Sequence, residues 1–129
     1  MSTKKEIINT SNAPAPIGPY NQAVKAGNTL YVSGQIALSP ESGTLVQGTV
    51  EAETRRVLDN LEAILVAAGY AFADVVKTTI FLRSMDDFGV VNEVYGTYFK
   101  EYSPARETVA VAGLPKNVHV EISLIAWKA

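Results

Sequence analysis

The residues best suited to chemistry are one carboxylate and one guanidinium in the last quarter of the chain, Glu121 and Arg106. Glu121 lies in the strongly β-forming stretch 118–127, where burial would raise its pKa towards the range useful for proton transfer. A solvated strand carboxylate fits the same pattern equally well. Arg106 follows Pro104-Ala105 and begins a strand, so its fixed backbone suits a guanidinium that grips a planar carboxylate. From the residue alone, an ordinary surface arginine is the more economical interpretation.

Other positions carry weaker signals. The small pair Ser33-Gly34 lies near the end of a predicted strand and would let a ligand approach the backbone, although a β-bulge explains it equally well. Asn92 lies on a predicted helix, where an exposed polar residue is the default interpretation. His119 is better explained as a half-exposed strand residue than as a base. The pair Asp86-Asp87 is typical of a helix start and does not indicate a paired-carboxylate site.

Composition excludes several classes of site. The 129 residues, 47% hydrophobic and 19% charged, predict one globular domain spanning 1–129. Eleven basic and 13 acidic residues give a net charge of −2, which argues against a dedicated nucleic-acid binder. The absence of cysteine excludes disulfides, thiolate metal sites and a catalytic thiol, and a single histidine makes a histidine-based triad or metal site unexpected. Chemistry must therefore use carboxylates, arginine, hydroxyls, backbone groups and water.

The N-terminal segment 1–6 is charged, and no apolar core of signal-peptide length follows it. No apolar run approaches the roughly 20 residues that a membrane-spanning helix needs. We therefore expect a soluble, cytoplasmic protein without a membrane partner.

Two helices are predicted from the pattern. Apolar residues recur at helical spacing from Val50 to Ala68, with Thr49 as the N-cap and Gly69 as the stop. Ser84, with Asp87 three residues later, resembles a capping box that opens a second helix. The predicted core stripe of that helix is Phe88, Val91, Tyr95, Tyr98 and Phe99.

Strands and loops account for the rest of the chain. Ala13–Pro19 is too rich in proline for a helix or a central strand and is expected to be an ordered extended loop. The predicted strands are 20–25, 29–36, 75–82, 106–112 and 118–127, with turns at 26–28, 39–43 and 114–117.

The order of these elements predicts an α+β fold with a mixed sheet. Two strand–helix–strand crossovers imply parallel neighbours, and hairpins at both ends of the chain imply antiparallel ones. Both helices then lie on one face of the sheet. Because strands 75–82 and 118–127 are apolar on both faces, the second face needs a cover. Another copy of the chain is the simplest cover, so we expect a homo-oligomer.

Four segments resemble the reactive intermediate deaminase family, RidA, also called the YjgF family. They are Asn12-Ala13-Pro14-Ala15-Pro16-Ile17-Gly18-Pro19-Tyr20, Val32-Ser33-Gly34-Gln35-Ile36, Val91-Asn92-Glu93-Val94-Tyr95, and the stretch from Pro104-Ala105-Arg106 through Leu114-Pro115-Lys116 to Val120-Glu121-Ile122. Each motif is weak by itself. In this order, from residue 9 to the C-terminus without a large gap, they are specific.

The resemblance implies a chorismate-mutase-like α+β fold assembled as a homotrimer with three clefts between subunits. It implies a 2-iminobutanoate/2-iminopropanoate deaminase, which hydrolyses the enamine/imine products of pyridoxal-phosphate dehydratases to 2-oxo acids and ammonia. It implies no metal and no organic cofactor, because a protonated imine is already electrophilic. The partners expected are a small 2-imino acid and further copies of the chain.

The family pattern falls on six positions: Tyr20, Ser33, Gly34, Asn92, Arg106 and Glu121. The resemblance implies that Arg106 holds the substrate carboxylate and Glu121 orders water and relays its proton, while backbone N–H groups just after Arg106 polarise the reacting group. Tyr20 and Ser33-Gly34 are expected to form the opposing wall, contributed by the neighbouring chain. Many relatives have cysteine where this chain has Thr108; we expect Thr108 to act there through its backbone N–H.

Two alternatives stay open. One is a trimer that binds carboxylic metabolites, or acts like a chaperone, without turnover. The other is an endoribonuclease or translation inhibitor, against which the net charge, the single histidine and the lack of a basic or aromatic platform argue. The preferred imine, the physiological dehydratase and any second role cannot be deduced from the sequence.

Overall fold

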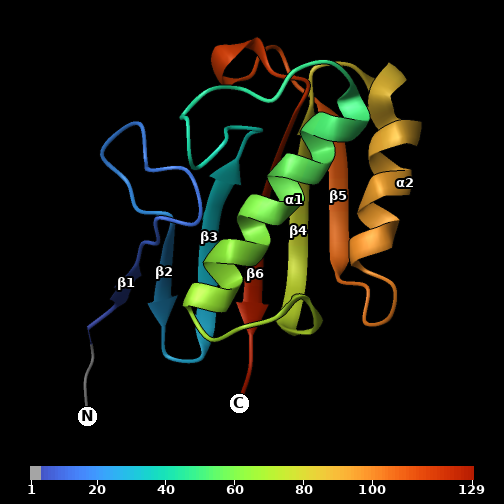
Figure 1. The fold of residues 1–129 in the computed structure, drawn as a ribbon. Coiled ribbons are helices and arrows are strands. Elements are labelled where there is room, and N and C mark those ends of the chain that lie inside the picture. The colour runs from blue at the N-terminus through green and yellow to red at the C-terminus, as the bar shows by residue number, and fades with distance from the viewer. Residues whose placement is uncertain (1–3) are drawn as a thin grey trace.

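Both helices cover the same face of one six-stranded sheet with strand order β1-β2-β3-β6-β4-β5 (Figure 1). The computed structural model describes residues 4–129. The strands are β1 Glu6–Ile8, β2 Ala23–Ala26, β3 Thr29–Gln35, β4 Val75–Leu82, β5 Ala105–Ala110 and β6 Val120–Trp127. The helices are α1 Val50–Ala67 and α2 Phe88–Tyr98, with short 3-10 turns at Phe72–Asp74, Met85–Asp87 and Pro115–Asn117. The α+β class predicted from the sequence is confirmed.

Helix α1 forms where the periodicity predicts it. The Thr49 hydroxyl accepts a hydrogen bond from the Ala52 N–H at 3.0 Å, so Thr49 is the N-cap. Gly69 adopts a φ of +82°, which favours glycine, and ends the helical run. The buried stripe of α1 packs on β3, β6 and α2. The helix therefore covers the centre of the sheet.

Helix α2 starts differently from the prediction. Ser84 accepts a hydrogen bond from the Asp86 N–H at 3.1 Å and caps a 3-10 turn, so the expected capping box with Asp87 is wrong. The helix begins only at Phe88 and buries Val91 and Tyr95, which the stripe predicted, and also Val94, which it did not.

The position of β6 is the main correction to the predicted topology. The β2–β3 hairpin and the parallel β4–β5 pair are confirmed. However, β6 pairs antiparallel with both β3 and β4, so the predicted hairpin between β5 and β6 is wrong, and β3 and β4 are not neighbours. The physical reason is burial: β6 is apolar enough for the middle of the sheet, whereas β5, with the sequence Ala-Arg-Glu-Thr-Val-Ala, suits an edge. Strand β1 was not predicted.

The two faces of the sheet have different surroundings. Beneath the helices the strands are fully buried through residues such as Leu30, Ile80 and Ile122. On the other face Tyr31 is 50% exposed and Trp127 51% exposed, and neither helix covers them. The uncovered apolar face expected from the sequence is therefore present in the chain.

Candidate functional site

Arg106 of β5 lies on a platform made by α2. Its guanidinium donates a hydrogen bond to the Asn92 side-chain oxygen at 2.8 Å. The guanidinium carbon lies 4.9 Å from the centre of the Tyr95 ring and 5.7 Å from that of Phe88. Residues 88, 92 and 95 share one face of the helix because of their i, i+4, i+7 spacing. This contact set holds the guanidinium in place while leaving N–H donors for a ligand.

The aromatic part of this platform is itself anchored. The Tyr95 and Thr78 hydroxyls are hydrogen-bonded at 2.7 Å, and both residues are buried. Burial raises the pKa of Tyr95 above its ordinary value, so the phenol stays neutral. The sequence analysis assigned Tyr95 and Phe88 to the core only. Their spacing from Asn92 places all three on one helix face, and this spacing could have indicated that they contact the same group.

Thr108 lies two residues beyond Arg106, on the same face of β5. The Val111 N–H donates to the Leu82 carbonyl at 2.9 Å, towards β4. Because N–H groups along a strand point alternately to its two sides, those of Arg106 and Thr108 point to the free edge of the sheet. The backbone role expected for Thr108 is therefore geometrically available.

Glu121 occupies the face of the sheet that the helices leave uncovered. It pairs with Phe81 across the β4–β6 ladder and is partly buried. This burial raises the pKa of its carboxyl group above the ordinary value for glutamate. Of the two interpretations of Glu121, the structure therefore favours the partly buried carboxylate with a raised pKa over the solvated strand carboxylate.

Gly34 lies directly against Glu121 of the same chain. A Cβ placed on Gly34 would lie 2.5 Å from a Glu121 carboxylate oxygen, so a larger residue here would require the glutamate side chain to move. The register between β3 and β6 also shifts between Val32 and Gln35. The bulge offered as one explanation of the small pair is confirmed. The group found against Gly34 is the Glu121 side chain, and the approach of a ligand to this backbone stays a prediction.

The segment that carries Tyr20 and Ser33 is tied together by main-chain contacts. The Ser33 hydroxyl donates to the Asn21 carbonyl at 2.7 Å, and the Ser33 N–H donates to the Gln22 carbonyl at 2.9 Å. Gln22 is buried, and its side-chain amide donates to the carbonyls of Thr10, Ala13 and Pro14. Gln22 organises the proline-rich loop, a role that sequence reasoning missed, and Tyr20 beside it is largely exposed.

Within one chain, Arg106 and Glu121 lie on opposite faces of the sheet. Arg106 pairs with Thr78, whose side chain points to the helices, whereas Glu121 pairs with Phe81 on the uncovered face. Tyr20 and Ser33-Gly34 of a neighbouring chain were expected to form the wall opposite Arg106 and Glu121. For Glu121 this grouping is wrong, because it lies against Gly34 of its own chain, while the contribution of a second chain stays a prediction. The structure groups Glu121 with Gly34, and Arg106 with Asn92, in two separate half-sites.

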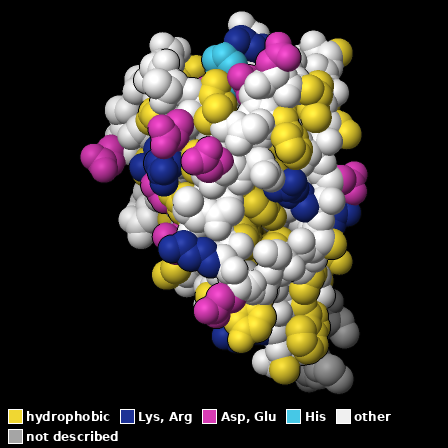
Figure 2. Space-filling view, turned by 90° about the vertical axis from the view of Figure 1, so that its right-hand side faces the viewer, with side chains coloured by type: hydrophobic (Ala, Val, Ile, Leu, Met, Phe, Trp, Pro, Cys, Tyr) yellow, Lys and Arg dark blue, Asp and Glu magenta, His cyan; other side chains and the backbone are white. Residues whose placement is uncertain are grey.

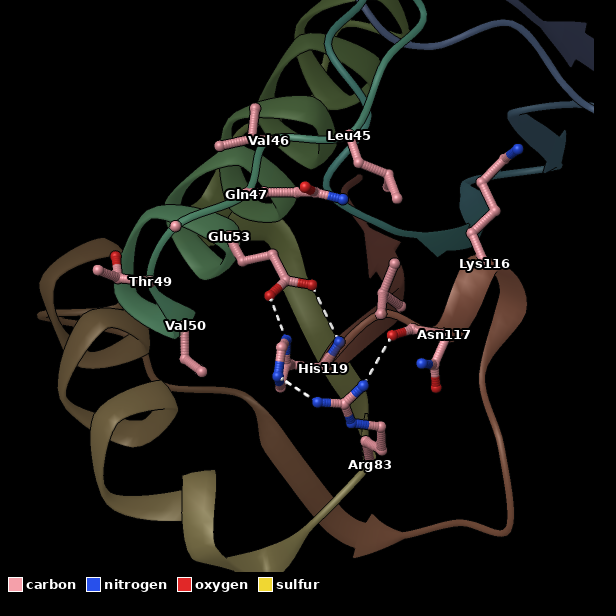
Figure 3. Close-up of a pocket in the computed structure, with 12 residues that line it drawn as sticks. Leu45, Val46, Gln47, Thr49, Val50, Glu53, Arg83, Lys116, Asn117 and His119 are labelled. Carbon is pink, nitrogen blue, oxygen red and sulfur yellow. Dashed lines mark hydrogen bonds and ion pairs between the residues drawn. The ribbon is translucent and has the colours of Figure 1, made fainter.

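None of the predicted site residues lines the cavity beside the start of β6. This cavity of about 440 Å³ lies between the segment before α1 and the start of β6 (Figure 3). Glu53, Arg83 and His119 form a hydrogen-bonded chain in its wall. His119 is partly exposed, as expected, but it precedes β6 and its ring contacts α1 through Glu53.

Residues 4–129 contain neither a cluster of metal ligands nor a membrane-spanning helix. In this part of the chain no group of three His, Cys, Asp or Glu side chains is arranged to hold a metal ion. Nor does any helix there have the length and apolar character needed to span a membrane.

Comparisons with known proteins agree with the motifs. The family model described as Endoribonuclease L-PSP matches residues 10–128. A RutC family protein of Pyrococcus horikoshii is 54% identical, over 96% of this chain and 98% of its own. The 2-iminobutanoate/2-iminopropanoate deaminase of Mus musculus is 52% identical, over 95% of this chain and 90% of its own. Escherichia coli TdcF, solved with bound serine, superposes with a TM-score of 0.92 at 42% identity, covering 96% and 99% of the two chains. The chain therefore belongs to the Endoribonuclease L-PSP family, that is, the YjgF/RidA family.

Proposed function

We propose that this protein hydrolyses 2-imino acids, such as 2-iminobutanoate and 2-iminopropanoate, to 2-oxo acids and ammonia. The observation that carries the proposal is Arg106, a guanidinium fixed by Asn92 and two aromatic rings with donors left for a carboxylate. The half-buried carboxylate Glu121 supplies the base. The deaminase name of the mouse relative, at 52% identity, supports the same reaction class.

Both half-sites act together only if two chains contribute. Because Arg106 and Glu121 lie on opposite faces of the sheet in one chain, a substrate that contacts both must lie between copies. We propose a homotrimer with three clefts. Each would combine Tyr20, Ser33, Gly34 and Glu121 of one chain with Asn92, Arg106 and Thr108 of the next. The exposed Tyr31 and Trp127 and the free edge of β5 support this arrangement.

The chemistry follows from these positions. Arg106 receives the substrate carboxylate as a planar fork and fixes the imine carbon beside Glu121. Glu121 takes a proton from water as the oxygen adds to the protonated imine carbon, and then returns that proton to the amino nitrogen. The new hydroxyl then passes its proton to the Glu121 carboxylate as the C–N bond breaks. Ammonia and the 2-oxo acid leave, and Glu121 releases the proton to solvent. The free N–H groups of Arg106 and Thr108 stabilise charge that develops at the reacting group.

A carboxylate-binding protein without turnover is the second candidate. The bound serine in the Escherichia coli relative supports it, because an amino acid presents the same carboxylate. The description of the family model favours RNA cleavage instead. Against that, basic and acidic side chains are interspersed on the α2–β5 side of the molecule, with no basic platform (Figure 2).

One assay separates these functions. 2-Iminobutanoate is generated in situ by a dehydratase, and 2-oxo acid release is followed with and without this protein, while the same preparation is tested on RNA. The proposal expects accelerated 2-oxo acid release that Glu121→Gln lowers by roughly 10²- to 10⁴-fold, and no RNA cleavage. Binding of 2-oxo acid without acceleration would establish the second candidate instead. A single domain over 1–129 and a cytoplasmic location stay predictions.

A further inference from the structure

Glu53, His119 and Arg83 form a hydrogen-bonded chain that has no part in the proposed reaction. Both ring nitrogens of His119 and both carboxylate oxygens of Glu53 have partners within this chain. Glu53, in the first turn of α1, is only 6% exposed. One of its carboxylate oxygens accepts the His119 backbone N–H at 2.9 Å, and the other contacts His119 Nδ1 at 2.8 Å. An Arg83 guanidinium nitrogen contacts the remaining ring nitrogen, Nε2 (Figure 3).

These contacts fix the tautomer of His119. A guanidinium can only donate, so Nε2 accepts from Arg83. Nδ1 then carries the proton and donates it to the Glu53 carboxylate. The ring therefore joins the start of α1 to Arg83, the residue directly after β4.

Arg83 in turn holds the turn that leads into β6. Its guanidinium donates to the Asn117 carbonyl at 3.0 Å, and its backbone N–H donates to the His119 carbonyl at 3.0 Å. Lys116 and Asn117 have φ values of +53° and +55°, a conformation that is strained for a side chain larger than hydrogen. Such a turn persists where its surroundings over-determine it, and Arg83 supplies several of these contacts.

Glu121 lies two residues after His119, where the sheet holds β6 from one side only. On the β4 side, Leu82 pairs with Val120 and Phe81 with Glu121. On the β3 side, pairing begins only at Ile122, with Gln35, and the register shift falls between this pair and the pair Val32–Leu124. The Glu121 carboxylate lies against Gly34, where a Cβ would displace it. Within the sheet, Val120 and Glu121 are therefore held by β4 alone, and the segment 117–119 leads directly into them.

We propose that Arg83, oriented by His119 and Glu53, is a positioning residue that sets the distance of Glu121 from Gly34 and from the attacking water. The inference rests on the proposed function, because it assigns Arg83 a role in that same site. In this proposal Arg83 contacts neither the substrate nor the attacking water and acts through the backbone of 117–119.

Arg83→Gln is the first test, with 2-iminobutanoate as the substrate. We expect kcat to fall by about 10- to 100-fold, because a small misplacement of a catalytic group reduces the rate by this much. The KM should change less than about two-fold, because Arg106 and its α2 platform stay intact. Arg55→Gln, which removes an exposed arginine paired with Glu51 on α1, is the matched control and should leave kcat unchanged. Circular dichroism and oligomer mass check that the variants fold.

Two readouts separate positioning from a merely structural role. Freed from its place beside Gly34, Glu121 becomes more exposed, so the acidic limb of the kcat–pH profile should move to lower pH in Arg83→Gln. His119→Gln places a side-chain oxygen that can accept from Arg83, and should retain more activity than His119→Leu.

A double mutant connects the effect to Glu121. Added to Glu121→Gln, Arg83→Gln should cause no further loss, since the group it positions is gone. An unchanged kcat in Arg83→Gln, or an additive loss in the double mutant, would overturn the proposal while leaving the proposed function intact. Native rates in Glu121→Gln alone would instead overturn the proposed function.

Discussion

Arg106 shows how much one side chain's surroundings decide its use. In the sequence it is one of 11 basic residues, and a surface arginine was the economical interpretation. In the structure Asn92 and the rings of Tyr95 and Phe88 hold it in one orientation, which a solvated arginine does not need. The guanidinium is therefore prepared for a planar anion before any ligand arrives.

Arg106→Lys keeps the charge but loses both the fork and the stacking geometry. We expect it to cost nearly as much activity as Arg106→Ala, roughly 10- to 150-fold for each charge-assisted hydrogen bond lost. The measurement is 2-oxo acid release from 2-iminobutanoate, with Arg55→Lys as the control. Near-native rates in Arg106→Lys would remove the carboxylate fork from the mechanism.

The raised pKa of Glu121 has a consequence for stability. The folded chain binds this proton more tightly than the unfolded chain, so stability falls as pH rises from the ordinary to the raised pKa, and the cost remains at higher pH. Glu121→Gln removes the charge, so its Tm should exceed that of the wild type at pH 7. Below the ordinary carboxyl pKa of about 4.3 the two should coincide.

Thermal unfolding of both proteins at the two pH values provides the measurement. The exposed Glu62, changed to Gln, is the matched control and should show no such pH-dependent difference. Equal Tm values for Glu121→Gln and the wild type at pH 7 would mean that the carboxylate carries no burial cost.

At the scale of elements, local signals predicted local structure. The Thr49 cap and the apolar stripe of α1 depend on residues within a few positions of one another, and both are confirmed. The central place of β6 depends on which distant strands it meets, and adjacency in sequence wrongly suggested β5. Glu53 illustrates the same limit. It is buried in the first turn of α1, and its partner, His119, lies 66 residues away in the sequence.

The same difference between local and long-range information applies to the candidate site. Gly34 and Glu121 were both predicted, but their grouping was not, because strand alternation and the position of β6 decide it. The side chains of Gln22 and Arg83 donate hydrogen bonds to backbone carbonyls of distant segments, and no local sequence pattern predicts such contacts.

Gly34→Ala tests the contact between β3 and β6. The added Cβ would lie 2.5 Å from a Glu121 oxygen and 3.1 Å from its Cγ, so the glutamate must move. We expect kcat for 2-iminobutanoate to fall by about 10- to 100-fold with little change in fold. Gly96→Ala, where nothing lies within 4 Å of the new Cβ, is the control. Equal activity of both variants would show that the position of Glu121 does not matter.

At the scale of the whole molecule, the chain leaves one sheet face uncovered and one sheet edge free. Light scattering coupled to size exclusion should therefore give three times the mass of the chain. The variants Arg106→Ala and Glu121→Ala should keep this mass, since neither residue belongs to the core cluster. A monomer at micromolar concentration would contradict both the trimer and the shared cleft.

The central claim is that each site takes Arg106 from one chain and Glu121 from its neighbour. Arg106→Ala and Glu121→Ala should each be inactive alone. Unfolded together in equal amounts and refolded, they should form mixed trimers in which about a quarter of the clefts carry both native residues. The account predicts recovery of 2-oxo acid release from 2-iminobutanoate to about a quarter of the wild-type rate. If the mixed trimers form and no activity returns, both residues act from the same chain, and the account is contradicted.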